Sequence, residues 1–252
     1  MTARTVRTAR KAPVLPDLAL EQSLAAARRT AEGAGSGPLL VAGMDEVGRG
    51  ALAGPVSVGV VVVRMPDDGP HPAVRDSKAL SAKRRTALVP EILAWGAAAA
   101  VGHAEPGEID RYGITAALAL AGRRAWHRVA GELGRIPDLL LLDGRDNWLP
   151  KAPAALCGAL APGPGAVHLQ VKADATCASV AAASILAKVE RDGLMTGLAE
   201  AFPAYGWEGN KGYGASAHRL AIAAQGPSPY HRMSWNLGLG QSPAVEQAEW
   251  TA

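Results

Sequence analysis

A run of four leucines constrains the fold of this chain more strongly than any other feature. The leucines occupy positions 139–142, between Pro137 and the Asp143-Gly144 pair, so turn-forming residues bound an uninterrupted apolar segment on both sides. A short segment of this kind is typical of a strand that is buried on both faces of its sheet. The sequence therefore predicts a sheet that is covered by helices.

The remaining periodicity predicts the other elements of the fold. Short apolar runs bounded by glycine and proline predict strands at residues 39–44, 55–63, 97–104 and 167–171. Helical spacing predicts helices at 18–32, 81–94, 108–133 and 175–202, with an interruption near Gly113 and a kink or early end at Pro90. Strands cluster early and then alternate with helices, so we expect the α/β class, with a mixed sheet flanked by helices.

Composition narrows the class of protein but not its function. Hydrophobic residues make up 48% of the 252 residues, which excludes a disordered chain, and the formal charge of +3 neither names nor excludes a nucleic-acid partner. The two cysteines, Cys157 and Cys177, lie in no zinc-binding pattern, so we expect a reduced, cytoplasmic protein. The longest apolar run, residues 52–63, is shorter than the roughly 20 residues of a membrane-spanning helix.

Three of the predicted strands lead into acidic residues. These are Asp45-Glu46 after the first strand, Asp143 after the leucine run, and Asp174 after residues 167–172. Sites collect at strand ends, and four converging carboxylates would repel one another unless divalent cations bound them. An all-oxygen donor set favours Mg²⁺ or Mn²⁺. Taken singly, Asp143-Gly144 is also a turn signal, and Asp174 is also a candidate helix N-cap.

The tripeptide Gly48-Arg49-Gly50 follows the first acidic pair. Two glycines beside an arginine let backbone amides approach a phosphate or sugar closely while the guanidinium supplies positive charge. The alternative interpretation is an exposed tight turn.

Several segments match one family in order. They are residues 42–56 (AGMDEVGRGALAGPV), 76–78 (DSK), 108–114 (EIDRYGI), 142–144 (LDG), 172–192 (KADATCASVAAASILAKVERD) and 210–214 (NKGYG), followed by His218. Together they resemble bacterial ribonuclease HII over roughly residues 17–235. The chain departs from the family's common pattern at Ala51, Ala173 and Cys177.

The resemblance implies a ribonuclease H fold with a helical C-terminal appendage. It also implies an endoribonuclease that hydrolyses RNA in RNA–DNA hybrids and single ribonucleotides in duplex DNA, leaving 5′-phosphate and 3′-hydroxyl ends. Two Mn²⁺ or Mg²⁺ ions about 4 Å apart would serve the reaction, and we expect the substrate phosphate to complete their coordination. By the same resemblance, the catalytic metal ligands are Asp45, Glu46, Asp143 and Asp174.

The resemblance also implies how substrate is recognised. Gly48, Arg49 and Gly50 would contact the ribonucleotide backbone, and Tyr213 would pack on the adjacent deoxyribose. The 2′-hydroxyl is the group that distinguishes RNA from DNA. Lys78 is a candidate phosphate contact, with a solvated lysine as the alternative, and the alternative for Tyr213 is a half-buried surface aromatic.

The expected organisation has four parts. Residues 1–17 form a basic flexible arm, for which an organelle transit peptide is an alternative; residues 18–200 form the catalytic domain with its N-terminal helix. Residues 201–237 form a substrate-binding helical segment, and residues 238–252 a disordered tail. We expect a monomer that binds RNA–DNA duplexes and no membrane, with a sliding clamp as a possible partner.

Other polar residues are expected to be structural. Lys188, Arg191 and Asp192 fit a charged helix face with internal pairing, and His218 and His231 fit structural or phosphate-facing positions. The small residues at 181–184 would allow a helix to pack closely on the sheet.

Two other functions remain open. One is a non-catalytic nucleic-acid-binding module, against which the four intact acids weigh. The other is a structure-specific DNA nuclease of the same superfamily, which would lack the Gly48-Arg49-Gly50 loop and Tyr213 in this arrangement.

Overall fold

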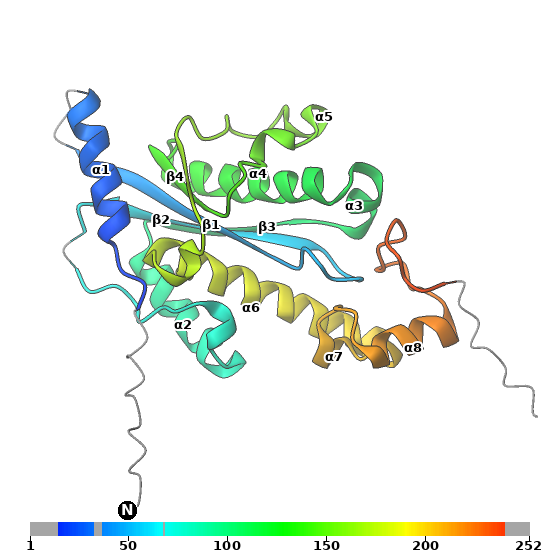
Figure 1. Cartoon of the computed structure of the whole chain (residues 1–252). Helices are drawn as coiled ribbons and strands as arrows, with labels where there is room; N and C mark the ends of the chain where they lie inside the picture. Colours follow the sequence, from blue (N-terminus) through cyan, green and yellow to red (C-terminus); the bar gives the residue numbers. More distant parts are fainter. Residues whose placement is uncertain (1–14, 33–36, 68, 240–252) are drawn as a thin grey trace, which may run out of the picture.

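The computed structural model describes residues 15–32, 37–67 and 69–239, and these form one mixed sheet with helices on both faces (Figure 1). The strand order is β3-β2-β1-β4-β5. β1 pairs with β2 and β2 with β3 in antiparallel fashion, whereas β1–β4 and β4–β5 are parallel. The strands are β1 (Leu39–Val47), β2 (Val56–Met65), β3 (Ala98–Ala104), β4 (Leu139–Asp143) and β5 (Val167–Gln170). The predicted mixed sheet is confirmed.

Helix α4 covers one face of the sheet, and α6 with α2 covers the other (Figure 1). The long predicted helix near Gly113 is two helices, as expected, because Gly113 ends α3 and precedes α4. The helices are α1 (Ala19–Glu32), α2 (Ala82–Trp95), α3 (Pro106–Tyr112), α4 (Ile114–Leu133), α5 (Ala154–Cys157), α6 (Ala178–Ala201), α7 (Trp207–Asn210) and α8 (Ser216–Gln225).

The leucine run is β4, an interior strand buried on both faces of the sheet, as predicted. Leu140 and Leu142 lie in the core beneath α4, while Leu141 packs with Val180 of α6 on the opposite face. Successive side chains of a strand point to opposite faces of the sheet, so an unbroken apolar run packs against the helices on both faces.

Several predicted boundaries differ from the structure, and three of the differences have a clear physical reason. β1 continues to Val47 because its antiparallel pairing with β2 persists to the Val47–Ser57 pair. α2 continues through Pro90, whose ring is exposed, because the buried side chains of Leu88 and Ile92 anchor the helix on either side. The early end predicted at Pro90 is therefore wrong. The N-cap of α2 is Ser81.

The start of α6 is the third difference. A 3₁₀ turn, η3 (Ala173–Ala175), precedes the helix, and the N-cap of α6 is Cys177. Asp174 is therefore not the helix cap, which leaves its carboxylate available for another role.

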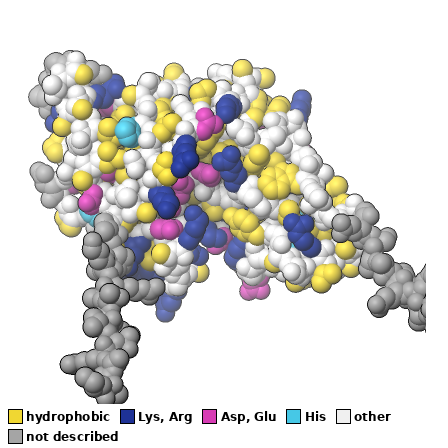
Figure 2. Space-filling view, viewed as in Figure 1, with side chains coloured by type: hydrophobic (Ala, Val, Ile, Leu, Met, Phe, Trp, Pro, Cys, Tyr) yellow, Lys and Arg dark blue, Asp and Glu magenta, His cyan; other side chains and the backbone are white. Residues whose placement is uncertain are grey.

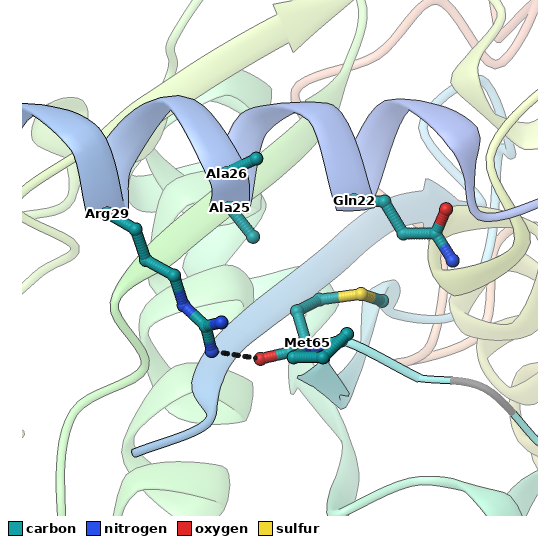
Figure 3. A pocket seen from close by; sticks show the side chains of 6 residues that line it. Gln22, Ala25, Ala26, Arg29 and Met65 are labelled. Carbon is teal, nitrogen blue, oxygen red and sulfur yellow. Dashed lines mark hydrogen bonds between the residues drawn. The ribbon is translucent and has the colours of Figure 1, made fainter. Parts of the chain in front are cut away.

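Helix α1 is fastened to the sheet and to the start of α6. Arg29 donates a hydrogen bond to the carbonyl oxygen of Met65 at 2.7 Å (Figure 3). It donates another to the carbonyl oxygen of Gly37 at 3.1 Å. The carboxylate of Glu21 is fully buried and accepts hydrogen bonds from the backbone N–H and hydroxyl of Ser179. α1 thus supports the first turn of α6.

The irregular segment after α6 has a small core of its own. Trp207, Tyr205 and Ile222 pack with Met195 of α6 and with Leu52 from the loop after β1. His218 and His231 are buried inside this core, so the structural interpretation of these histidines is confirmed.

Hydrogen bonds require both of these imidazoles to be neutral. The indole N–H of Trp207 donates to Nε2 of His218 at 3.0 Å, and the backbone N–H of Ser228 donates to Nδ1 of His231 at 2.9 Å. Each ring therefore needs one unprotonated nitrogen as an acceptor. Burial lowers the pKa of His218, and burial together with the neighbouring His218 lowers the pKa of His231 to about 4.

Some predictions fall outside the described residues, namely most of the basic arm at 1–17 and most of the tail at 238–252. None of the described helices is both long and apolar enough to cross a lipid bilayer. Cys157 and Cys177 are both free.

The buried histidines predict a pH-dependent stability. Between pH 6.5 and 4 the unfolded chain binds a proton that folded His231 does not, so the free energy of unfolding falls as the pH is lowered. Urea unfolding should show the wild type losing about 2 kcal/mol more than His231→Asn between pH 7 and 4.5. The control His168→Asn, outside this core, should follow the wild type, and equal losses in all three proteins would contradict the account.

Candidate active site at the strand ends

The parallel pairing of β1 and β4 brings two acidic residues side by side. Met44 is opposite Leu142 in the register, so the next residues along the two strands are Asp45 and Asp143. Oδ1 of Asp143 accepts a hydrogen bond from the backbone N–H of Ala173 at 2.7 Å, which ties the end of β4 to the turn that carries Asp174. Three separate segments thus deliver carboxylates to one edge of the sheet.

The charges of these carboxylates are close enough to affect one another. Burial raises the pKa of Asp45 to about 7, with a smaller increase from the charges of Glu46 and Asp143. Burial also raises the pKa of Glu46 and that of Asp174, and the charge of Asp143 adds to both increases. Asp143 is therefore the common electrostatic neighbour of the other three acids.

Two basic residues predicted for the site lie against this cluster. The ammonium of Lys78 is 4.0 Å from Oδ2 of Asp174, and the guanidinium of Arg49 is 3.7 Å from Oε1 of Glu46. Both cations are largely exposed, so these pairs contribute little to stability and leave the charges accessible to an anion. In Figure 2, Lys and Arg side chains surround acidic ones near the centre of the face, where Figure 1 shows the sheet above α6.

A hollow of about 420 Å³ opens beside the acids. Glu46 and Lys78 line it, together with Ser184 and Lys188 of α6 and with Tyr213. Tyr213 is 38% exposed, which leaves part of its ring free for contact with another molecule. The structure thus brings Lys78 and Tyr213 to the predicted carboxylates from distant parts of the chain.

The donor set fits hard divalent cations, because the neighbouring donor atoms are carboxylate oxygens. Among residues 15–32, 37–67 and 69–239, no three side chains of the ligating types converge tightly enough to hold an ion unaided. Beyond the larger effect of burial, the charge of Asp143 nevertheless raises the pKa of each of the other three acids, so the four carboxylates lie near one another. Both observations fit a site in which a bound phosphate supplies the remaining oxygen ligands.

One positioning residue was not predicted. The hydroxyl of Ser184 hydrogen bonds the carboxylate of Asp45, which lowers the pKa of that acid, and Oγ of Ser184 lies 2.9 Å from Oγ of Ser77 beside Lys78. Ser184 belongs to the predicted run of small residues, but its hydroxyl carried no separate sequence signal.

That run packs as closely as expected. A Cβ added at Gly59 of β2 would lie 2.2 Å from the carbonyl oxygen of Ala183, and one at Gly43 of β1 would lie 2.4 Å from the backbone of Ser179. Glycine in both strands therefore lets α6 approach the sheet and place Ser184 against Asp45.

The predicted charged face of α6 is only partly correct. Lys188 and Asp192 form the expected ion pair, at 2.6 Å. The prediction that Arg191 belongs to that charged face is wrong, because its side chain is fully buried and donates hydrogen bonds to backbone carbonyl oxygens. Consecutive residues of an α-helix point about 100° apart, so Arg191 points away from the side of α6 that carries Asp192. Its side chain enters the loop after β1 instead.

Comparisons with known proteins agree with this geometry. A family model described as Ribonuclease HII matches residues 42–237. A ribonuclease HII from Paracoccus denitrificans is 46% identical over 224 residues, covering 87% of this chain and 91% of the relative. One from Streptomyces avermitilis is 42% identical over 202 residues, covering 79% of this chain and 78% of the relative.

Solved structures with similar folds carry related names. The crystal structure of the ribonuclease H2 from Pyrococcus horikoshii OT3 has a TM-score of 0.62 and 26% identity, covering 79% of this chain and 95% of that one. The crystal structure of Bst-RNase HIII in complex with Mn²⁺ has a TM-score of 0.61 and 25% identity, covering 80% of this chain and 68% of that one. The structure of the PCNA:RNase HII complex from Archaeoglobus fulgidus has a TM-score of 0.56 and 27% identity, covering 77% of this chain and 93% of that one.

Because α6 packs closely on the sheet, alanine substitutions at two glycines should change the free energy of unfolding in opposite directions. Gly59→Ala should lower the free energy of unfolding by about 2 to 3 kcal/mol, because the methyl group meets the backbone of α6. Gly193→Ala on α6 meets nothing within 4 Å and should raise it by up to about 1 kcal/mol. Urea unfolding measures both, and equal effects would contradict the packing described.

Proposed function

The chain belongs to the ribonuclease HII family, and we propose that the four carboxylates at its strand ends are the metal ligands of this ribonuclease. As a family member it is a divalent-metal-dependent ribonuclease H that hydrolyses RNA in RNA–DNA hybrids. The proposed ligands are Asp45, Glu46, Asp143 and Asp174. The observation that carries this assignment is the position of Asp143, whose charge acts on the other three acids.

The residues of the chain have distinct roles in the proposed reaction. Asp143 and Asp45 hold their carboxylates on rigid strands, so the site is aligned before substrate arrives. Ser184 fixes the orientation of Asp45, and Ala173 fixes that of Asp143. Two bound divalent ions would activate the attacking water and stabilise the leaving 3′-oxygen, which leaves a 5′-phosphate and a 3′-hydroxyl.

Substrate recognition is assigned to the neighbouring loops. We propose that Gly48, Arg49 and Gly50 contact the ribonucleotide backbone and that Tyr213 packs on the next deoxyribose. The half-exposed ring of Tyr213, on the same hollow as Glu46 and Lys78, supports this assignment. Lys78 is proposed to bind a phosphate, which its exposed ammonium can reach.

The ions proposed are two of Mn²⁺ or Mg²⁺, and one similar structure was solved in complex with Mn²⁺. Another similar structure is an archaeal complex with PCNA, so a sliding clamp is proposed as a possible partner of this chain. A cytoplasmic monomer remains the expectation, and the two free cysteines fit a reducing compartment.

Removal of one charge tests the metal site. Asp143→Asn keeps an oxygen that can accept the Ala173 hydrogen bond but loses the negative charge, so folding should be retained while cleavage falls by at least about 1,000-fold. Cleavage of a duplex carrying one ribonucleotide, with Mg²⁺ or Mn²⁺, measures the effect. Asp146→Asn, at an exposed ion pair with Lys151, is the control that should keep wild-type activity. Full activity in Asp143→Asn would refute the assignment.

Removal of the Ser184 hydroxyl should reduce cleavage by less than the loss of the Asp143 charge does. Ser184→Ala removes the hydrogen bond to Asp45, so kcat/KM for the same duplex should fall about 10-fold while the protein stays folded. Ser216→Ala removes an exposed hydroxyl from α8 and serves as the matched control. If both variants cleave at the wild-type rate, Ser184 does not position Asp45 for the reaction.

A further inference from the structure

Two arginines are buried beneath the Gly48-Arg49-Gly50 loop. Arg191 of α6 and Arg232 of the C-terminal segment are both fully shielded from solvent. Neither forms an ion pair with a carboxylate among the described residues, since neighbouring Asp192 pairs with Lys188 and Arg85. Their guanidinium groups bind backbone carbonyl oxygens instead.

Arg232 holds the loop at both of its ends. Its guanidinium donates to the carbonyl oxygens of Gly48 at 2.7 Å, Arg49 at 3.0 Å and Gly54 at 3.0 Å. The backbone N–H of Arg232 also donates to the carbonyl oxygen of Leu52 at 2.9 Å. One residue thus fixes the carbonyl groups along the whole turn.

Arg191 holds the far side of the same loop. It donates to the carbonyl oxygens of Pro55 at 2.8 Å and Ala53 at 3.1 Å, and to that of Lys211 at 3.0 Å. Its guanidinium carbon lies 5.5 Å from the centre of the Tyr213 ring. Arg191 therefore connects the loop after β1 to the turn that carries Tyr213.

Gly48 makes this arrangement possible. Its φ of +82° is a conformation that other residues adopt at a cost, and a Cβ at this position would lie 2.1 Å from Nε of Arg191. The glycine that brings the backbone close to substrate is thus also the glycine that admits the guanidinium beneath it.

The inward carbonyls leave the amides of the tripeptide free. Within the described chain, the N–H groups of Gly48, Arg49 and Gly50 donate to no other residue, whereas those of Leu52, Ala53 and Gly54 are bonded. Free backbone amides in a turn above buried positive charge form a site suited to a phosphate oxygen.

The cost of this arrangement argues that it serves the site. Burial lowers the pKa of both guanidinium groups, and burial with repulsion from Arg191 lowers that of Arg232 to about 9, which is still above pH 7. Arginine side chains remain protonated in proteins, so both groups are cations. The charges of Asp192 and Asp110 offset only part of the effect of burial, and neither acid forms an ion pair with these arginines. Two adjacent buried cations without a direct ion pair are expensive, and apolar side chains would fill the same space at less cost.

A third residue explains a motif that the metal chemistry does not use. Asp110, in the segment 108–114, accepts hydrogen bonds from the backbone N–H groups of Met233 and Ser234, each at 2.9 Å. These residues directly follow Arg232. The carboxylate of Asp110 therefore anchors the segment that delivers Arg232 to the loop.

We propose that Arg191 and Arg232, with Asp110 behind them, are positioning residues for ribonucleotide recognition. The two arginines bind six backbone carbonyl groups between residues 48 and 55, so that the amides of Gly48-Arg49-Gly50 and the ring of Tyr213 face the substrate in a fixed arrangement. The inference rests on the proposed role of this loop in binding the ribonucleotide. It adds residues that touch no substrate themselves.

Arg232→Lys tests the inference, because a single ammonium keeps the charge but cannot bind three carbonyl groups in a fork. The KM for a duplex carrying one ribonucleotide should rise about 10-fold, while kcat, which depends on untouched carboxylates, changes less than about 3-fold. Hydrogen exchange should become faster at Leu52, Ala53 and Gly54 and stay unchanged in β4. Arg128→Lys, which loses a bond to the strand carbonyl of Val101, is the matched control and should leave all these values unchanged.

Asp110→Ala is the milder variant if Arg232→Lys does not fold, and it should show the same rise in KM and the same faster exchange. Wild-type KM and exchange in these variants, or a fall in kcat at constant KM, would overturn the inference. Arg49→Ala separates the two claims. If it raises KM while Arg232→Lys does not, only the positioning role fails; if neither variant raises KM, the proposed role of the loop fails as well.

Discussion

The parallel pairing of β1 with β4 is the contact on which the rest of the site depends. It places Asp45 beside Asp143 at the ends of two buried strands, where the backbone is rigid and the side chains leave the core. The leucines of β4 make that position stable, because they fill the core on both faces of the sheet. The cost is a cluster of acids with raised pKa values, which bound cations would relieve.

Helix α6 connects this acidic edge to the substrate loop. Its first half lies close against glycines of β1 and β2 and carries Ser184, which bonds Asp45. Further along the same helix, Arg191 enters the loop after β1 and reaches the turn of Tyr213. A single rigid element therefore sets the distance between the carboxylates and the groups proposed to recognise ribose.

The sequence was sufficient for features that depend on local pattern. Strands, the division of the long helix at Gly113 and the strand-end acids follow from periodicity and turn residues, and the ordered motifs indicated the family. Features that depend on tertiary contacts were missed. Pro90 does not end its helix because Leu88 and Ile92 are buried, and Arg191 resembles any surface arginine until the loop after β1 covers it. Arg232 lies in a segment without periodicity, so no pattern marked it.

We propose that this fold cleaves at ribonucleotides because the strand-end acids and the Gly48-Arg49-Gly50 loop act together. The most direct measurement compares two duplexes of the same sequence, one entirely DNA and one carrying a single ribonucleotide, with wild-type protein and Mg²⁺ or Mn²⁺. We expect cleavage of the second duplex alone, at the ribonucleotide. Equal cleavage of both, or binding of the second duplex without cleavage in either metal, would contradict this proposal.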